Sequence, residues 1–88
     1  MIVRFHARFS KDIDKLKEIE LRNALEALII SLENVRTLHE IPNVKKLTGT
    51  PDAYRIKLGS YRVCFFYDKG VISLARVLPR KDVYKYFP

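Results

Sequence analysis

The 88 residues of this chain suffice for one small domain, spanning residues 1–88, and a hydrophobic content of 48% argues against disorder. The formal net charge is +7, from 17 Lys and Arg against 10 Asp and Glu. Residues 1–43 hold 7 basic and 7 acidic side chains, whereas residues 44–88 hold 10 basic and 3 acidic ones. The excess charge therefore predicts a basic surface in the second half, with a nucleic acid, an acidic protein or both as its partner.

The few cysteine and histidine residues argue against a disulfide, a reactive thiol and a metal site. The single cysteine, Cys64, cannot form an internal disulfide, which is typical of the reducing cytoplasm. It lies in an apolar run, so we expect a buried packing role rather than a reactive thiol. His6, His39 and Cys64 lack the spacing of metal ligands, and we expect no cofactor. We expect no signal peptide. Because no apolar run approaches the ~20 residues that span a bilayer, we also expect no membrane partner.

The first half predicts a strand followed by two helices. Met1 to His6 is expected to form the strand, and Ser10 to cap a first helix with Asp12 in its first turn. Phe9, Ile13 and Leu16 then share one face of that helix. The carboxylate pairs Asp12/Asp14 and Glu18/Glu20 are interpreted as favourable charges near helix starts.

The second helix is expected from about Ile19 to Val35. Its apolar side chains recur at steps of four and three from Leu21 to Val35, which predicts a face packed on a sheet rather than a coiled-coil seam. Pro42 ends this region, and residues 43–51 are expected to form a basic, turn-rich connection.

A first β-hairpin is predicted around Gly59-Ser60, a pair that fits a two-residue loop. In that register Lys57 lies opposite Arg62, and Arg55 opposite Cys64. Like charges directly opposite destabilise a sheet by up to about 1 kcal/mol. We therefore expect an anion, with phosphate as the obvious candidate, between these side chains.

A second hairpin is predicted around Asp68-Lys69-Gly70, read as a three-residue loop with Gly70 left-handed and a bulge beside it. That register places Arg76 opposite Arg62, whereas a two-residue loop would move Arg76 to the other face. A short C-terminal turn or helix is expected after Pro79.

The remaining candidate chemistry belongs to one cationic set with a nearby tyrosine. Its members are Arg55, Lys57, Arg62, Arg76 and Arg80, with Tyr84. Arginine can clamp a phosphate with two parallel hydrogen bonds, and a lysine among like charges can act as a base. Such a set could stabilise a phosphorane while the 2′-hydroxyl of an RNA attacks, without a metal. From these residues alone, binding without catalysis is favoured.

Several segments together resemble the RelE branch of the RelE/ParE superfamily, the toxins of type II toxin–antitoxin modules. They are Lys46 to Gly49, Tyr54 to Leu58, Gly59 to Val63 and Arg76 to Tyr84. The resemblance implies an α+β fold: a small antiparallel sheet, an N-terminal helical hairpin on one face and a short C-terminal helix or turn. It also implies an open basic concavity on the other face.

RelE-type members are ribosome-dependent endoribonucleases that cut mRNA, so the resemblance implies a cognate antitoxin, the ribosome and mRNA as partners. By position it places catalytic roles on Arg55, Lys57, Arg62, Arg80 and Tyr84. Additional RNA contacts are expected from Lys45, Lys46, Arg76 and Lys81. Pro79 stands where many relatives have histidine. Two alternatives stay open: a ParE-like protein that inhibits DNA gyrase without cutting RNA, and a degenerate toxin that only binds its antitoxin.

Overall fold

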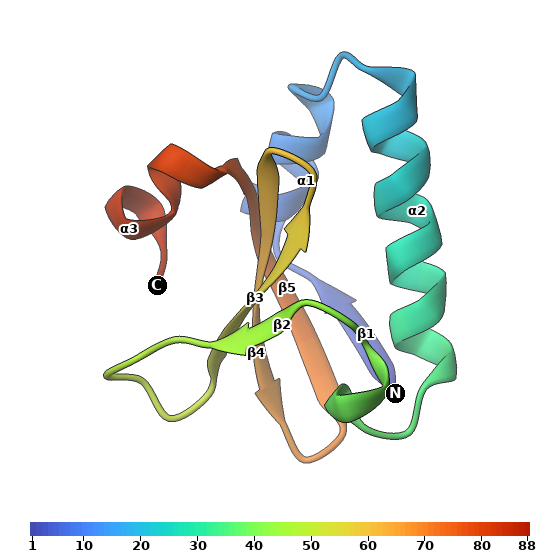
Figure 1. The fold of residues 1–88 in the computed structure, drawn as a ribbon, viewed down its shortest axis with the longest axis vertical. Helices are drawn as coiled ribbons and strands as arrows, with labels where there is room; N and C mark the ends of the chain where they lie inside the picture. Colours follow the sequence, from blue (N-terminus) through green and yellow to red (C-terminus); the bar gives the residue numbers. More distant parts are fainter.

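The computed structural model describes all 88 residues and contains one five-stranded sheet (Figure 1). The strands lie in the order β1-β5-β4-β3-β2. Their bounds are β1 (Ile2–Phe5), β2 (Val44–Lys46), β3 (Ala53–Leu58), β4 (Tyr61–Asp68) and β5 (Val71–Pro79). The first and last strands pair in parallel, and the other three pairs are antiparallel. The expected α+β class is confirmed, with this one parallel pair in an otherwise antiparallel sheet.

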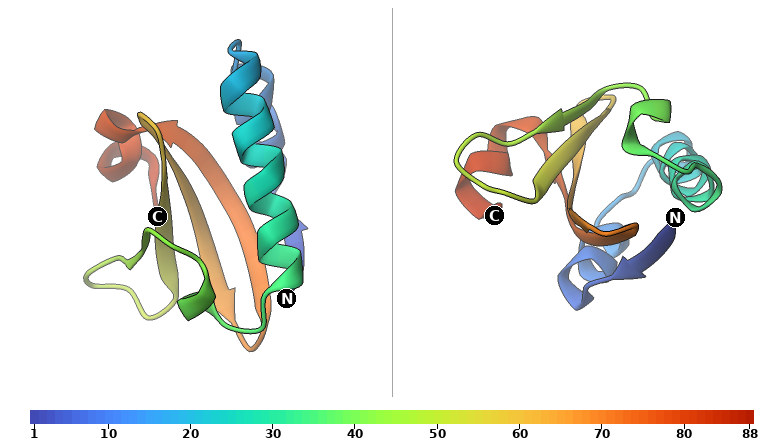
Figure 2. Two further views of the ribbon diagram at one scale, coloured as in Figure 1. Left: turned by 45° about the vertical axis from the view of Figure 1, so that its right-hand side comes forward. Right: turned by 90° about the horizontal axis from the view of Figure 1, so that it is seen from below.

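Two helices, α1 (Ala7–Asp14) and α2 (Ile19–Asn34), lie on one side of the sheet, as the left view of Figure 2 shows. The expected apolar stripe of α2 points inward: Leu25 is 3% exposed and Leu32 is fully buried. These residues pack with Phe9 of α1 and with Ile56 and Val63 of the sheet in the main core. The predicted helical hairpin and its packing face are confirmed.

A short helix, α3 (Val83–Tyr86), lies on the other side of the sheet and follows the 3-10 turn η2 (Arg80–Asp82). A smaller apolar cluster anchors it there, with Val83 fully buried and Phe87 5% exposed. Cys64 belongs to this cluster and is fully buried, which confirms its expected packing role. None of the helices has both the length and the hydrophobicity that crossing a membrane would need.

Ser10 does not cap α1, contrary to the sequence prediction. The helix begins at Ala7, directly after β1, and its N-cap residue is His6. This early start lets Phe9 reach the core within the first turn. Asp12 and Asp14 consequently lie at the C-terminal end of α1, where the helix dipole disfavours carboxylates. Their interpretation as helix-start charges is therefore wrong.

The first hairpin has the predicted register, with Leu58 opposite Tyr61 and Lys57 opposite Arg62. Gly59 has a φ of 60°, and such a left-handed first loop residue is typical of the tight turn that two-residue hairpins prefer. Because this turn fixes the register locally, it also determines which side chains of β3 and β4 share a face.

The second hairpin differs from the prediction. Its loop has two residues, Lys69 and Gly70, with φ values of 47° and 80°, so Gly70 is left-handed as expected. The irregularity lies farther along, at Cys64/Phe65 of β4, where β5 holds one extra residue. Leu74 and Val77 both face the main core although they are three positions apart, and the extra residue makes this possible. Arg76 therefore lies opposite Cys64, not Arg62.

Residues 43–51 also differ from a plain connection, because Val44–Lys46 form the edge strand β2. Lys45 pairs with Arg55 and Lys46 with Tyr54. A 3-10 turn, η1 (Leu38–Glu40), precedes the strand. Its Glu40 carboxylate accepts backbone hydrogen bonds from Arg36 and Thr37 at 2.9 and 3.0 Å, and these bonds lower the pKa of Glu40.

Candidate functional site

Four cationic side chains occupy one side of strands β2, β3 and β4, on the side that carries α3. Lys45, Arg55 and Cys64 follow one another across the sheet, and Lys57 lies opposite Arg62. Ile56 and Val63, the residues between these cations, are buried on the helical side. We call Lys45, Arg55, Lys57 and Arg62 the cationic face. The predicted placement of Arg55, Lys57 and Arg62 on one face is confirmed.

An open cavity of about 630 Å³ adjoins the cationic face. Its lining comes from β3, the β3–β4 loop, the end of β5, η2 and α3. The lining residues are Arg55, Ser60, Pro79, Arg80, Lys81 and Tyr84. Three of these six residues are cations and none is a carboxylate. Such a lining attracts anions, because no negative side chain within it neutralises the field. We call it the cationic cavity.

Arg55 and Tyr84 form one contact across this cavity. The guanidinium carbon of Arg55 lies 5.6 Å from the centroid of the Tyr84 ring, within the range of a cation–π interaction. Tyr84 is 79% exposed, so most of its ring remains open to solvent. A planar aromatic side chain beside a guanidinium group can stack on an unpaired nucleobase while the cation binds a phosphate.

The β3–β4 loop holds two further cationic residues in place. Nη1 of Arg62 donates hydrogen bonds to the carbonyl oxygens of Gly59 at 3.0 Å and Tyr61 at 2.8 Å. The remaining N–H groups of the guanidinium, on Nε and Nη2, are not used by these bonds. The backbone N–H of Arg80 donates to the carbonyl of Ser60 at 2.9 Å. The Gly59-Ser60 pair predicts the loop, but no sequence signal predicts these contacts, of which the bond from Arg80 connects η2 to the loop.

The guanidinium group of Arg76 is bound to a carboxylate and is not a free cation of this surface. Its Nε donates to Oδ2 of Asp12 at 2.8 Å, and its Nη2 donates to Oδ1 at 3.1 Å. The hydrogen bond with Asp12 raises the pKa of Arg76, so its side chain stays a cation. The expectation that Arg76 lies opposite Arg62 is wrong, because the two-residue loop and the extra residue in β5 together shift the register by two positions.

Lys46 is also separated from the other predicted residues. As a neighbour of Lys45 in β2 it points to the opposite face, where it lines a different cavity of about 590 Å³ with Tyr54, Tyr67 and His39. Lys81 lines the cationic cavity, as described above. The structure thus brings Lys45, Lys81 and all five predicted catalytic residues to one side, and leaves Lys46 outside.

Cys64 lies behind the cationic face, and its thiol is unreactive. Burial raises the pKa of its thiol to about 12, although the nearby Arg55 and Arg76 act in the opposite direction. A thiol with such a pKa is almost entirely protonated near neutral pH and is a poor nucleophile. No group of three or more His, Cys, Asp or Glu side chains is arranged to hold a metal ion.

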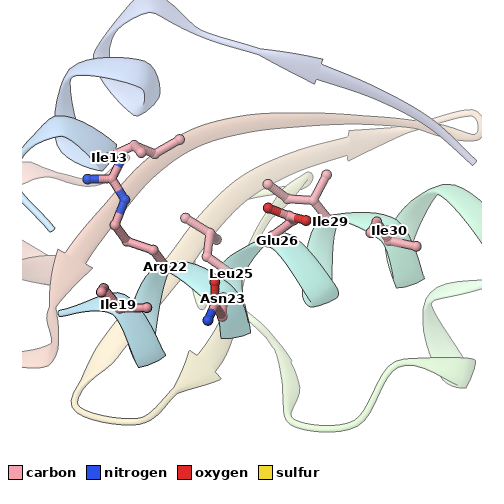
Figure 3. Close-up of a pocket in the computed structure, with 8 residues that line it drawn as sticks. All are labelled: Ile13, Ile19, Arg22, Asn23, Leu25, Glu26, Ile29 and Ile30. Atoms are coloured by element: carbon pink, nitrogen blue, oxygen red, sulfur yellow. The ribbon is translucent and has the colours of Figure 1, made fainter.

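The helical layer carries a second surface of different character. An apolar groove of about 430 Å³ runs along α2, next to the end of α1. Figure 3 shows the side chains that line it. Its lining includes Ile13, Leu25 and Ile29 and is bordered by Arg22 and Glu26. Ile19 is 73% and Ile30 is 50% exposed at this groove. Large apolar side chains exposed together are typical of a protein-binding surface.

A small sheet with two helices on one face and a cationic surface on the other is the architecture expected from the resemblance to the RelE/ParE superfamily. The sequence profile of the family described as "ParE toxin of type II toxin-antitoxin system, parDE" matches residues 3–84. The chain therefore belongs to the RelE/ParE superfamily of type II toxin–antitoxin toxins.

Within this superfamily the chain is similar to RelE proteins. "Toxin RelE3" of Methanocaldococcus jannaschii is 33% identical over 89 residues, covering 100% of both chains. A chain in the RelB-RelE antitoxin-toxin complex from Methanococcus jannaschii superposes with a TM-score of 0.82 at 30% identity, over 97% of this chain and 99% of that one. A chain of the intact E. coli RelBE complex gives 0.66 at 31% identity, over 89% and 94%. The chain is thus a RelE-related toxin.

Proposed function

We propose that this toxin is a metal-independent, ribosome-dependent endoribonuclease that cuts mRNA and is neutralised by an antitoxin. The cationic cavity is the observation that carries the proposal. It places Arg55, Arg80, Lys81 and the exposed Tyr84 ring around one open space, beside Lys57 and Arg62. This combination suits an RNA strand, because phosphates need cations and unpaired bases need an aromatic surface.

The proposed reaction uses the substrate's own nucleophile. The 2′-oxygen attacks the adjacent phosphorus, the bond from phosphorus to the 5′-oxygen breaks, and the products carry a 2′,3′-cyclic phosphate and a 5′-hydroxyl. Lys57, with Arg55, favours transfer of the 2′-hydroxyl proton to solvent, and Arg80 assists departure of the 5′-oxygen, which takes up a proton from solvent. Tyr84 stacks on the substrate base. Arg76 and Lys46 make no contact with the reacting phosphate in this scheme, given their positions in the structure.

Arg62 is the proposed transition-state donor. Two carbonyl contacts fix its guanidinium group before substrate binds, so little reorganisation accompanies the reaction. The N–H groups on Nε and Nη2 can then bind phosphoryl oxygens as negative charge develops on them. A preorganised donor of this kind commonly contributes on the order of 10²–10³-fold in rate.

The requirement for a ribosome follows from the small size and openness of the site. An 88-residue chain with an open cavity has little surface of its own with which to orient an RNA strand. Its basic half can instead bind ribosomal RNA electrostatically. The test is primer extension on mRNA from cells that briefly express the chain. We expect cuts phased with codons in translated regions. Rapid, site-specific cleavage of free mRNA without ribosomes would contradict the dependence.

The antitoxin is expected to use two surfaces. An apolar segment fits the groove along α2, and an acidic segment fits the cationic face. Ile19→Asp should weaken inhibition by the antitoxin, because the side chain is exposed and its change leaves the core intact. Equal inhibition of the variant and the parent would exclude the groove as a contact.

DNA gyrase is the second candidate target, because the matching family profile describes ParE toxins. The two functions share a fold, and fold alone does not determine activity. A supercoiling assay with purified gyrase separates them. Inhibition of supercoiling without codon-phased RNA cuts would favour the gyrase function over RNA cleavage. A chain inert in both assays but bound by its antitoxin would be the degenerate toxin considered above.

A further inference from the structure

Asp12 is the one charged residue that is buried, with 5% of its surface exposed. Besides the two bonds from Arg76, its Oδ2 accepts the backbone N–H of Val77 at 3.0 Å. Burial of a carboxylate is costly unless hydrogen bonds and an opposite charge compensate it. With three donors on two oxygens, Asp12 is held in a single, well-defined arrangement.

The place of Asp12 in the fold explains why a carboxylate is needed. Strand β1 ends at Phe5, opposite Leu74, so the rest of β5 has no strand neighbour on that edge. Helix α1 covers this part of β5, and Asp12 supplies the acceptor that a neighbouring strand would give to the N–H of Val77. The same carboxylate fixes Arg76, next to the extra residue of β5.

Arg76 in turn reaches α3. Its guanidinium carbon lies 5.7 Å from the centroid of the Tyr86 ring. Tyr86 stands two positions after Tyr84, the residue that contacts Arg55 at 5.6 Å. Helix α3 has only four residues and no side-chain hydrogen bond at its N-cap. A helix this short depends on tertiary contacts for its position.

We infer that Asp12 is a positioning residue of the cationic cavity. It holds Arg76 against Tyr86, and this contact fixes α3 so that Tyr84 lies against Arg55. The buried anchors Val83 and Phe87 attach α3 to the sheet, and the two cation–π contacts orient it. The role of Tyr84 in cleavage rests on the proposed function, but the coupling from Asp12 to Tyr84 does not.

Fluorine NMR tests the coupling without reference to activity. The chain labelled with 3-fluorotyrosine gives one signal for each of its five tyrosines, which Tyr→Phe variants assign. Asp12→Asn keeps the size of the side chain and removes its charge. We expect it to shift the signals of Tyr86 and Tyr84 and to leave that of Tyr54, which packs on the main core. The matched control is Asp14→Asn, an exposed carboxylate on the same helix. A Tyr84 signal at its parental position in Asp12→Asn would overturn the inference.

Single-turnover cleavage of mRNA on ribosomes tests the consequence. At a temperature where the variant is fully folded, Asp12→Asn should lower the maximal rate about tenfold or more, because small displacements of positioned groups have large effects. Tyr86→Leu should reproduce the loss, and Tyr86→Phe, which keeps the ring, should restore the rate. A rate loss that only matches the unfolded fraction would overturn the inference.

Two outcomes need a separate reading: misfolding of Asp12→Asn, and absence of RNA cleavage by the parent protein. If Asp12→Asn does not fold, the comparison of Tyr86→Leu with Tyr86→Phe decides in its place, and equal rates for these two variants would overturn the inference. If the parent protein cuts no RNA, the proposed function fails. The fluorine spectra then still support or overturn the coupling from Asp12 to Tyr84.

Discussion

Arg62→Ala offers the sharpest separation of catalysis from stability. The variant loses two hydrogen bonds from Nη1 to the carbonyls of Gly59 and Tyr61. Each contributes at most about 0.5–1.5 kcal/mol, and water can replace both, because Arg62 is not buried. The variant also removes the repulsion between Arg62 and Lys57, which are directly opposite, for a gain of about 0.2–1 kcal/mol. Without replacement by water the two bonds would total about 1–3 kcal/mol. Because water replaces both, the loss falls to about the size of the gain, and the two effects nearly cancel.

We therefore expect the free energy of unfolding of Arg62→Ala to lie within about 1 kcal/mol of the parent, a change in Tm of less than about 8 °C. The cleavage rate should fall on the order of 10²–10³-fold, because a preorganised donor to the phosphoryl oxygens is lost. Thermal unfolding by circular dichroism and single-turnover cleavage on ribosomes should be measured on the same preparation.

A matched control for this experiment is Arg36→Ala. Arg36 is exposed and lies outside the cationic face and the cationic cavity, so its loss tests the general effect of removing one positive charge. It should leave the cleavage rate unchanged. Full activity of Arg62→Ala, or unfolding of this variant under conditions where the parent is folded, would refute the assignment of Arg62 as transition-state donor.

Three further predictions concern Tyr84, Lys45 and the buried Cys64. Tyr84→Ala should raise the free-energy barrier to cleavage by about 1–3 kcal/mol, the contribution of one stacked base, whereas Tyr84→Phe should retain activity. Equal cleavage rates for the two variants would exclude stacking. Lys45→Ala should weaken RNA binding and reduce its salt dependence by about one charge, whereas Lys46→Ala, on the opposite face, should do neither in the same titration. Cys64, with a pKa of about 12, should react with iodoacetamide at pH 8 about 10³-fold more slowly in the folded protein than in urea, and equal rates would show that it is accessible.

The raised pKa of Cys64 also predicts how stability depends on pH. Because the folded-state pKa lies above the ordinary value of 9.0, the protonated thiol favours the folded state. This contribution is complete below pH 9 and is lost as the pH rises from 9 towards 12. Thermal unfolding at pH 8 and pH 10.5 should show the loss in the parent, and the loss should be smaller in Cys64→Ala. An equal loss in both proteins would assign the pH dependence to other groups.

The net charge of each half of the sequence does not predict how charged side chains are distributed on the folded surface. The first half is neutral by sequence, yet its residues 1–17 hold five cations and only Asp12 and Asp14 as carboxylates. Asp12 is buried and paired with Arg76 from the basic half. The exposed side of α1 is consequently basic, with Arg8, Lys11 and Lys15, and the carboxylates of the first half concentrate from Glu18 onward. A contact between residues 64 positions apart cannot be counted from local composition.

The sequence alone determined the features that depend on neighbouring residues. The Gly59-Ser60 turn fixes the register of β3 and β4 because a two-residue loop leaves one pairing. Alternation then places Arg55 and Lys57 on one face, and the four-and-three spacing places the leucines of α2 on the core. These local rules were enough to predict the cationic face and the packing of its reverse side.

Only the tertiary structure decided the second hairpin and the role of Asp12. The Asp68-Lys69-Gly70 segment is compatible with either loop length, so the register of β5 depended on which side chains the core accepts. Leu74 and Val77 are both buried, and the break in alternation between them was the one sequence signal for the extra residue. Pairing of β1 with β5, and the contact of α1 with the remaining edge, join segments at opposite ends of the chain. Such contacts form because buried polar groups must find partners, and the folded arrangement determines which partners are within reach.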